Sequence, residues 1–317
     1  MNAQPGGIFY TVEVFFVYQY PKNIQTTAQL LQKWTNAGMK IDPSDNALDV
    51  LNNVGYYRLK GYSFHLLDKT TQQFYSGTTF ADVFRLYQFD SQLSHLLFDF
   101  LSEIEVSLRA RFVNALLLCK DALILDDPSV FSDKEKYWKN RSAIASEIAR
   151  SNDVFILHNF DNHDGAVPLW AVVEVISFGT LSKTIKNLKT GTAVSSALIR
   201  DYKFKNQAGN LILPSWNMLT SWIQAASVMR NICAHNGRIY NRVINTAPQL
   251  IQSDTICPRP KYNGLYQILL AMKYLRPTDA SWNALSAKLT ALLVQYASVI
   301  DLNRINFPAD WAAHFQL

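Results

Sequence analysis

The stretch from Phe80 to Leu118 constrains the fold more than any other part of the sequence, because apolar side chains recur in it at helical spacing. Residues three or four positions apart share one face of an α-helix, so this pattern predicts one long helix or two helices in tandem. We expect this stretch to be the central element of the fold. The apolar positions are Val83, Phe84, Tyr87, Leu93, Leu96, Leu97, Phe100, Leu101, Ile104, Leu108, Phe112 and Leu116.

Helical periodicity also dominates the rest of the chain, so the predicted fold class is mainly α. Residues 26–38 begin with a threonine suited to cap a helix and end with a glycine suited to follow one. Further helices are predicted at residues 216–235, 264–275 and 282–300. The sequence contains no internal repeat and no heptad run long enough for a coiled coil.

Residues 62–79 mix aromatic and β-branched side chains with polar turn signals, which is compatible with a small β-hairpin. We divide the chain after this stretch. Residues 1–78 are predicted to form an N-terminal helical and hairpin region that packs on the body. Residues 79–317 are predicted to form the helical body.

Composition places the chain among ordinary globular proteins, with 49% hydrophobic residues, 12 glycines and 11 prolines. The apolar run at residues 8–20 is short, contains Glu13 and follows no basic segment, so we interpret it as a strand or a docked arm. Cys119, Cys233 and Cys257 are widely spaced and form no metal-ligand pattern, as is typical of buried thiols in a reducing cytosol. We therefore expect a cytoplasmic protein with no metal, no cofactor and no membrane partner.

The net charge of +5 conceals a strong asymmetry along the chain. Residues 181–278 contain thirteen basic residues and two acidic ones, which gives this segment +11 and leaves −6 for the remainder. A one-sided excess of this size indicates a polyanionic partner, and nucleic acid is the natural candidate. The alternative is a solvated basic face that binds no partner.

A polar cluster with the sequence RNICAHNGRIYNR occupies residues 230–242, behind one of the predicted apolar helices. The pair Asn236 and Gly237 suits the left-handed conformation that ends a helix, so His235 falls in the last turn. The helix dipole stabilises an imidazolium ion there, which suits His235 to hold and release a proton. Asn231 shares a face with His235, whereas Arg230 lies about 140° round the helix from that histidine and must reach round.

An arginine, a histidine and an amide at one helix end could together hold a phosphodiester: the arginine neutralises charge, the histidine moves a proton and the amide fixes the pose. The alternative is that His235 caps backbone carbonyls and that Arg230 is a structural residue paired with an acidic helix. The Arg-x4–6-His spacing arises easily by chance. A second match, Arg58 to His65, is set aside because Gly61 and the hairpin-like composition argue against a helix there.

Residues beside the cluster give further hypotheses. Arg238 and Arg242 lie four apart after the helix end and could line an RNA path, with Tyr240 available to stack on a base. A solvated turn is the alternative for these three. Glu105 and Arg109 are spaced as an ion pair within the long helix, and they either form that pair alone or also brace Arg230 from within the bundle.

Five segments, taken together and in order, resemble the Abi-like proteins of bacterial abortive-infection systems, the AbiD/AbiF group. This group belongs with the HEPN superfamily, so the resemblance implies a multi-helix HEPN-type bundle with additional helices. The segments are GYYRLKGY (55–62), GTTF-x5-LYQFD (77–90), IEVSLRARF (104–112), PLWAVVEVISFGTLSKTIKNL (168–188) and SWIQAASVMRNICAHNGRIYNR (221–242).

The superfamily's Arg-x4–6-His motif marks metal-independent ribonucleases, and on that pattern the resemblance implies catalytic roles for Arg230, Asn231 and His235. The chain departs from the family pattern in two places. Asn236 stands where a second histidine is frequent, which leaves the motif intact. Ser94 and His95 replace an expected basic pair, which alters a surface that could bind a partner.

The implied function is a toxic endoribonuclease of phage defence that cleaves single-stranded RNA by attack of the ribose 2′-OH. That reaction needs a base, an acid and a cation, whereas one motif supplies one histidine. We therefore expect a homodimer that pairs two motifs, or a monomer held inactive. The alternative function is an RNA-binding protein that captures a structured non-coding RNA, with the motif used for binding.

Overall fold

The computed structural model describes residues 23–205, 209–251 and 264–317, and the structural statements below refer to these residues. The structure is 65% helical, and its one small sheet in the described part has two antiparallel strands, which confirms the mainly α class. The predicted arm at residues 8–20 and Cys257 lie outside the described residues. Cys233 is buried and Cys119 is partly buried.

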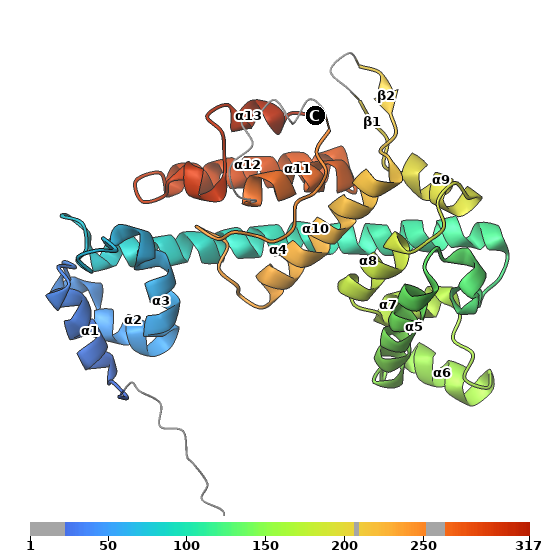
Figure 1. Cartoon of the computed structure of the whole chain (residues 1–317), viewed down its shortest axis with the longest axis horizontal. Coiled ribbons are helices and arrows are strands. Elements are labelled where there is room, and N and C mark those ends of the chain that lie inside the picture. The colour runs from blue at the N-terminus through green and yellow to red at the C-terminus, as the bar shows by residue number, and fades with distance from the viewer. Residues whose placement is uncertain (1–22, 206–208, 252–263) are drawn as a thin grey trace, which may run out of the picture.

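Helix α4, Phe80–Leu116, is the axis of the molecule (Figure 1). It is one continuous helix of 37 residues, which at 1.5 Å per residue extends about 55 Å. Thr79 caps its first turn by accepting a hydrogen bond from the backbone N–H of Asp82. The predicted apolar stripe is its buried face, since Leu93, Leu97 and Leu108 have no exposed surface.

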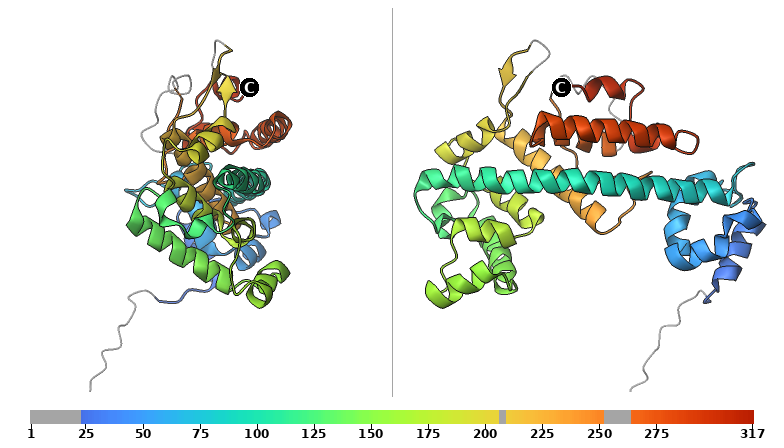
Figure 2. Two further views of the ribbon diagram at one scale, coloured as in Figure 1. Left: turned by 90° about the vertical axis from the view of Figure 1, so that its right-hand side faces the viewer. Right: turned by 180° about the vertical axis from the view of Figure 1, so that it is seen from behind.

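The other helices pack along α4 in separate groups. Helices α1–α3 lie at its N-terminal end and α5–α8 at its opposite end, while α10 crosses it between them (Figures 1 and 2). Helices α11 and α12 lie on another side of α4, which we call the rod, and α12 runs beside it. The bounds are α1 Thr27–Asn36, α2 Ala47–Val54, α3 Tyr56–Ser63, α5 Lys134–Ala149, α6 Val154–Asn162, α7 Leu169–Val175, α8 Phe178–Lys186, α9 Ala193–Arg200, α10 Trp216–Ala234, α11 Leu265–Leu275, α12 Asp279–Gln295 and α13 Trp311–His314.

The hairpin prediction for residues 62–79 is wrong in its location. Helix α3 continues through Gly61 to Ser63, and the following stretch contains a single antiparallel bridge between Leu67 and Phe74. Burial of Leu59 against the core, which leaves that side chain no exposed surface, outweighs the modest helix penalty of a glycine. The small hairpin lies elsewhere, with strand β1 at Phe204–Lys205 paired to β2 at Leu211–Ile212.

Helix α10 crosses α4, and the bounds predicted for it are confirmed to within a residue. Ser215 caps its start, and its apolar side buries Trp222, Ile223 and Ala226 completely against its neighbours. Helix α10 packs on α4, α8 and α11. These contacts fix the position of its C-terminal end relative to α4. Among the described helices, none combines the length and the apolar character needed to cross a bilayer.

We expect Leu97→Ala to lower the free energy of unfolding by about 2–5 kcal/mol, because it leaves a cavity where a side chain of α4 with no exposed surface is packed. The control is Val106→Ala on the same helix, where the side chain is 68% exposed and the expected change is within about 0.5 kcal/mol. Chemical denaturation followed by circular dichroism measures both. Equal losses in the two variants would contradict the central position of α4.

Candidate active site at the end of helix α10

The end of α10 is closed by backbone hydrogen bonds that place His235 at the surface. Asn236 adopts the left-handed conformation, with φ of 49°. Its N–H donates to the carbonyl of Cys233 at 3.0 Å, and the N–H of Gly237 donates to the carbonyl of Ile232 at 2.7 Å. This is the helix end predicted from the Asn-Gly pair. His235 is therefore the capping residue, and its imidazole is exposed.

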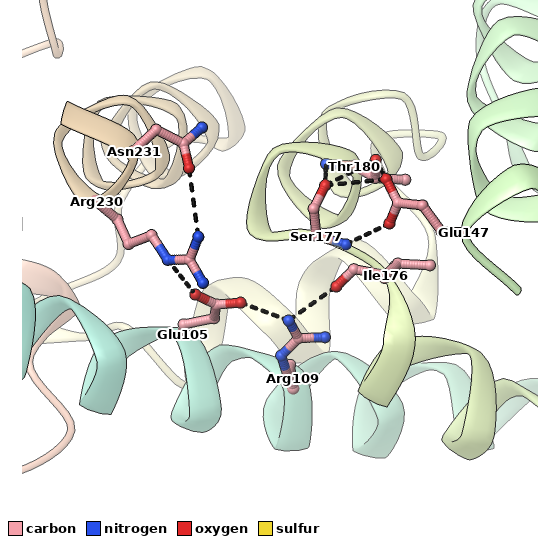
Figure 3. Close-up of polar contacts among 8 residues, drawn as sticks. All are labelled: Glu105, Arg109, Glu147, Ile176, Ser177, Thr180, Arg230 and Asn231. Carbon is pink, nitrogen blue, oxygen red and sulfur yellow. Dashed lines mark hydrogen bonds and ion pairs between the residues drawn. The ribbon is translucent and has the colours of Figure 1, made fainter. Parts of the chain in front are cut away.

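Glu105 joins Arg230 to the long helix. Its carboxylate lies 3.1 Å from Nε of Arg230, and its other oxygen accepts a hydrogen bond from Nη2 of Arg109 (Figure 3). The Glu105 side chain is 8% exposed, so this carboxylate is held between two guanidinium groups in a largely dry place. The predicted intrahelical pair is present, and Glu105 braces Arg230 as well.

The guanidinium of Arg230 is fixed on further sides. It lies over the ring of Phe98, 5.8 Å from the centroid, and its Nη1 is 3.5 Å from Oδ1 of Asn231. The side chain is nevertheless 31% exposed, and Asn231 is exposed beside it. A guanidinium with one side held and another open to solvent fits a structural pairing, and it also fits the recognition of a phosphate.

Residues at the start of α8 hold Arg109, the second arginine of this network, in place. Nη2 of Arg109 also donates to the carbonyl of Ile176 at 2.8 Å. The next residue, Ser177, caps α8, and its backbone N–H and hydroxyl both donate to the carboxylate of Glu147. The hydroxyl of Thr180 donates to the same carboxylate at 2.8 Å (Figure 3). The serine and threonine of this helix junction thus hold the carbonyl that positions Arg109.

The loop after α10 is anchored by Asp90 of α4. The buried carboxylate of Asp90 accepts hydrogen bonds from the backbone N–H groups of Ile239, at 3.0 Å, and Tyr240, at 2.7 Å. It also accepts one from the hydroxyl of Tyr62 at 2.7 Å. Burial raises the pKa of Asp90, while these three donors favour the charged form. A missing Asp90 would leave two buried N–H groups without a partner.

Helix α3 clamps this loop through two reciprocal arginine contacts. Nη1 of Arg58 donates to the carbonyl of Asn236 at 2.8 Å, and Nη1 of Arg238 donates to the carbonyl of Gly61 at 2.7 Å. The expectation that the surroundings of Arg58 are not helical is wrong, because α3 contains both Arg58 and Gly61. The contact with Asn236 places Arg58 directly beside the motif, although His65 lies elsewhere, edge-on to Tyr240.

The predicted RNA-contacting residues separate into different roles. Tyr240 has no exposed surface and its hydroxyl accepts a hydrogen bond from the N–H of Asp301, so the prediction that it stacks on a base is wrong. Its ring packs against Phe89, because the chain turns inward after the helix end. Arg238 is hydrogen-bonded to the carbonyl of Gly61 in α3, so its guanidinium is partly occupied. Arg242 is exposed and its Nη1 donates to the carbonyl of Arg238, so it stays available at the surface.

A polar cavity of about 330 Å³ opens between α3, α4 and the end of α10. Its lining includes Arg58, His95, Asn236 and the buried Asp90. A larger and mainly apolar cavity of about 690 Å³ lies at α6 and α7, lined by residues from 122 to 174, and none of the motif residues lines it. The smaller cavity adjoins the end of α10, because Asn236 and Gly237 line it, but Arg230, Asn231 and His235 do not line it either.

Sequence reasoning from spacing alone missed Arg58 and Asp90. A signal for both was present, since they stand in GYYRLKGY and GTTF-x5-LYQFD, two of the segments that carry the family resemblance. Nothing in either segment indicates its partner, because each contact spans well over a hundred residues of sequence.

Comparison with known proteins supports the resemblance seen in these segments. The family model described as Abi-like protein matches residues 49–241, more than half of the chain. The match includes α3, α4, α8 and α10, the helices that build the cavity and the Glu105 network. No curated protein and no solved structure matches the chain.

Removal of the shared carboxylate tests the Glu105 network. We expect Glu105→Ala to lower the free energy of unfolding by about 3 kcal/mol, because two partly buried guanidinium groups lose their counter-charge. The matched control is Glu103→Ala, an exposed position on the same helix, with an expected change within about 0.5 kcal/mol. Denaturant titration of both variants gives the comparison. A loss for Glu105→Ala no larger than for the control would refute the network.

The packing of His65 predicts a dependence of stability on pH. Burial, with the charge of Arg304, lowers the pKa of His65 to about 4. The folded state therefore keeps this imidazole neutral, and stability is lost as pH falls from 6.5 towards 4. Because the side chain is partly exposed, we expect wild type to lose about 1 kcal/mol more than His65→Gln between pH 7 and pH 5. Parallel unfolding curves at the two pH values measure this, and identical losses would contradict it.

Proposed function

The chain belongs to the family of Abi-like proteins, and from that premise we propose that it is a metal-independent endoribonuclease of the HEPN type that acts in abortive infection. The observation that carries the proposal is the arrangement at the end of α10. There Arg230 is braced by Glu105 while Asn231 and His235 remain exposed. A bracing carboxylate fixes the direction of a guanidinium without covering it, as a preorganised phosphate site requires.

In the proposed reaction the ribose 2′-OH attacks the adjacent phosphorus and the 5′-oxygen leaves. Arg230 neutralises the charge that develops on the phosphorane oxygens. His235 transfers a proton, and the amide of Asn231 fixes the position of the phosphate. Arg242, exposed just beyond the helix end, is proposed to contact the RNA backbone.

A set of exposed basic residues, called the basic band below, lies on α8, at the end of α9 and at strand β1. The side chain of Lys186 reaches α10, where its Nζ lies 2.9 Å from Oε1 of Gln224. We propose that this band binds the backbone of a single-stranded polyanion whose scissile phosphate lies at the motif. The exposed cations are Lys183, Lys186, Lys189, Arg200, Lys203 and Lys205.

The same band favours a second candidate function, the capture of a structured non-coding RNA with the motif used for binding. The two candidates differ in what happens to the RNA. A binding protein retains an intact RNA, whereas the enzyme leaves a 2′,3′-cyclic phosphate and a 5′-hydroxyl. A homodimer that pairs two copies of the motif remains our expectation for an enzyme with only His235 to transfer protons.

Cleavage of end-labelled single-stranded RNA by the purified protein in EDTA tests the proposal. We expect wild type to produce 2′,3′-cyclic ends and His235→Ala to be at least about 100-fold slower, because it lacks a proton-transfer group. Arg230→Lys keeps the charge but not the bidentate fork, so we also expect it to be slow. His163→Ala, an exposed histidine outside the motif, is the control. Intact RNA that copurifies and is never cut would favour the binding function instead.

A further inference from the structure

Helix α6 presents an apolar surface that the described part of the chain leaves uncovered. Ile156 is the buried apolar residue of this helix, and its other apolar side chains are exposed. Phe155 of α6 and Trp170 of α7 both line the cavity of about 690 Å³, so the cavity opens within this surface. Exposed apolar patches of this kind mark the places where another molecule docks. We call the following exposed side chains the α6 surface: Val154, Phe155, Leu157, Phe160 and Trp170.

The surroundings of the α6 surface are acidic. Residues 151–182 contain four carboxylates and no lysine or arginine, which gives this stretch a formal charge of −4 with its two histidines neutral. Glu174 lines the cavity, one turn of α7 beyond Trp170. The phosphates of RNA would be repelled here, so the occupant that fits is both apolar and basic. The carboxylates, all exposed, are Asp153, Asp161, Asp164 and Glu174.

The small hairpin carries a second exposed apolar surface, with the opposite charge. Phe204 of β1 faces the body, where its ring centroid lies 5.0 Å from that of Tyr274. Side chains alternate along a strand, so Lys205 points to the opposite face, and its cross-strand partner Leu211 points the same way. Leu211 is 63% exposed, and Leu213, two residues further on, is exposed as well. We call the following exposed side chains the hairpin face: Lys203, Lys205, Leu211 and Leu213.

The two surfaces lie on opposite sides of the molecule. The hairpin projects from one side of α4, and α6 lies on the other side (Figures 1 and 2). Because the body of the protein stands between them, the hairpin face of one copy can reach only the α6 surface of another copy. The two surfaces are complementary, since one combines leucines with lysines and the other combines aromatic and aliphatic side chains with carboxylates.

We propose that the hairpin face of one copy docks on the α6 surface of a second copy. Leu211 and Leu213 enter the cavity at α6 and α7, where they pack against Phe155 and Trp170. Lys205 lies against the carboxylates around the cavity and pairs with Glu174. Burial of the apolar side chains drives the association, and the opposite charges fix its orientation.

Such a contact is heterologous, because it joins two different surfaces and leaves each pair of copies with one free surface of each kind. It is separate from any pairing of motifs, since neither surface includes Arg230 or His235, and it does not depend on the proposed cleavage. Lys203 and Lys205 also belong to the basic band, so a copy docked on the hairpin covers that end of the band.

Sedimentation velocity over a concentration series, with the full-length protein freed of nucleic acid, tests the contact. We expect wild type to sediment faster as its concentration rises. Trp170→Asp and Leu211→Asp each place a charge in the apolar contact, so we expect either one to weaken the association at least about tenfold. Both side chains are largely exposed, so melting temperatures should be unchanged. Val294→Asp on α12, an exposed apolar position outside both surfaces, is the control.

Mixing the two variants tests whether the contact joins different surfaces. Trp170→Asp keeps its hairpin face and Leu211→Asp keeps its α6 surface, so we expect an equimolar mixture to recover the association that neither variant shows alone. Charge reversal tests the orientation. We expect Glu174→Lys or Lys205→Glu alone to weaken the association several-fold, and both changes in one chain to restore it.

Other results would overturn the proposal in distinguishable ways. Wild type whose sedimentation is independent of concentration has no such contact. A stable dimer that every variant retains would overturn the proposal and leave the pairing of motifs standing. Association that Leu211→Asp retains would show that the α6 surface does not bind the hairpin, and a mixture that does not recover would exclude a contact between two different surfaces.

Discussion

The carboxylate of Glu105 is the interaction on which the arrangement of the site depends. A buried carboxylate is costly unless it is paired, and here it is paired with guanidinium groups from α4 and from α10. Arg230 and His235 point in different directions on an ideal helix, so helical geometry alone does not explain how they could act on one phosphate. The contact with Glu105 sets the direction of Arg230 independently. Arg230 is held by its partner on the rod, so its position does not depend on helical geometry alone.

A second carboxylate on the same rod fixes the chain just beyond the motif. Asp90 precedes Glu105 by about 22 Å of helix and binds the backbone where the loop turns inward. Helix α3, whose Tyr62 also bonds Asp90, holds the same loop through Arg58 and Arg238. The segments that resemble the Abi-like family are scattered from residue 55 to residue 242. In the structure they meet around the end of α10, and α4 fixes their relative positions.

Features set by local chemistry could be predicted from the sequence. The apolar stripe of α4, the extent of α10 and its Asn-Gly ending depend on neighbouring residues and were predicted close to where they are. Features set by tertiary burial could not. Gly61 suggested a turn but lies in a helix packed on the core, and Tyr240 looked free to stack on a base but is enclosed beneath the loop. The partners of Glu105 and Asp90 depend on which helices meet, and no local pattern encodes that.

The most direct test of this account is a double-mutant cycle between Glu105 and Arg230, measured as free energies of unfolding. Each residue is replaced by alanine singly and together, and the difference between the double change and the sum of the single changes gives their coupling. If Glu105 holds Arg230 at the end of α10, the coupling should exceed about 1 kcal/mol. Single changes that add to within about 0.3 kcal/mol would contradict the account, because Arg230 would then be positioned without the long helix.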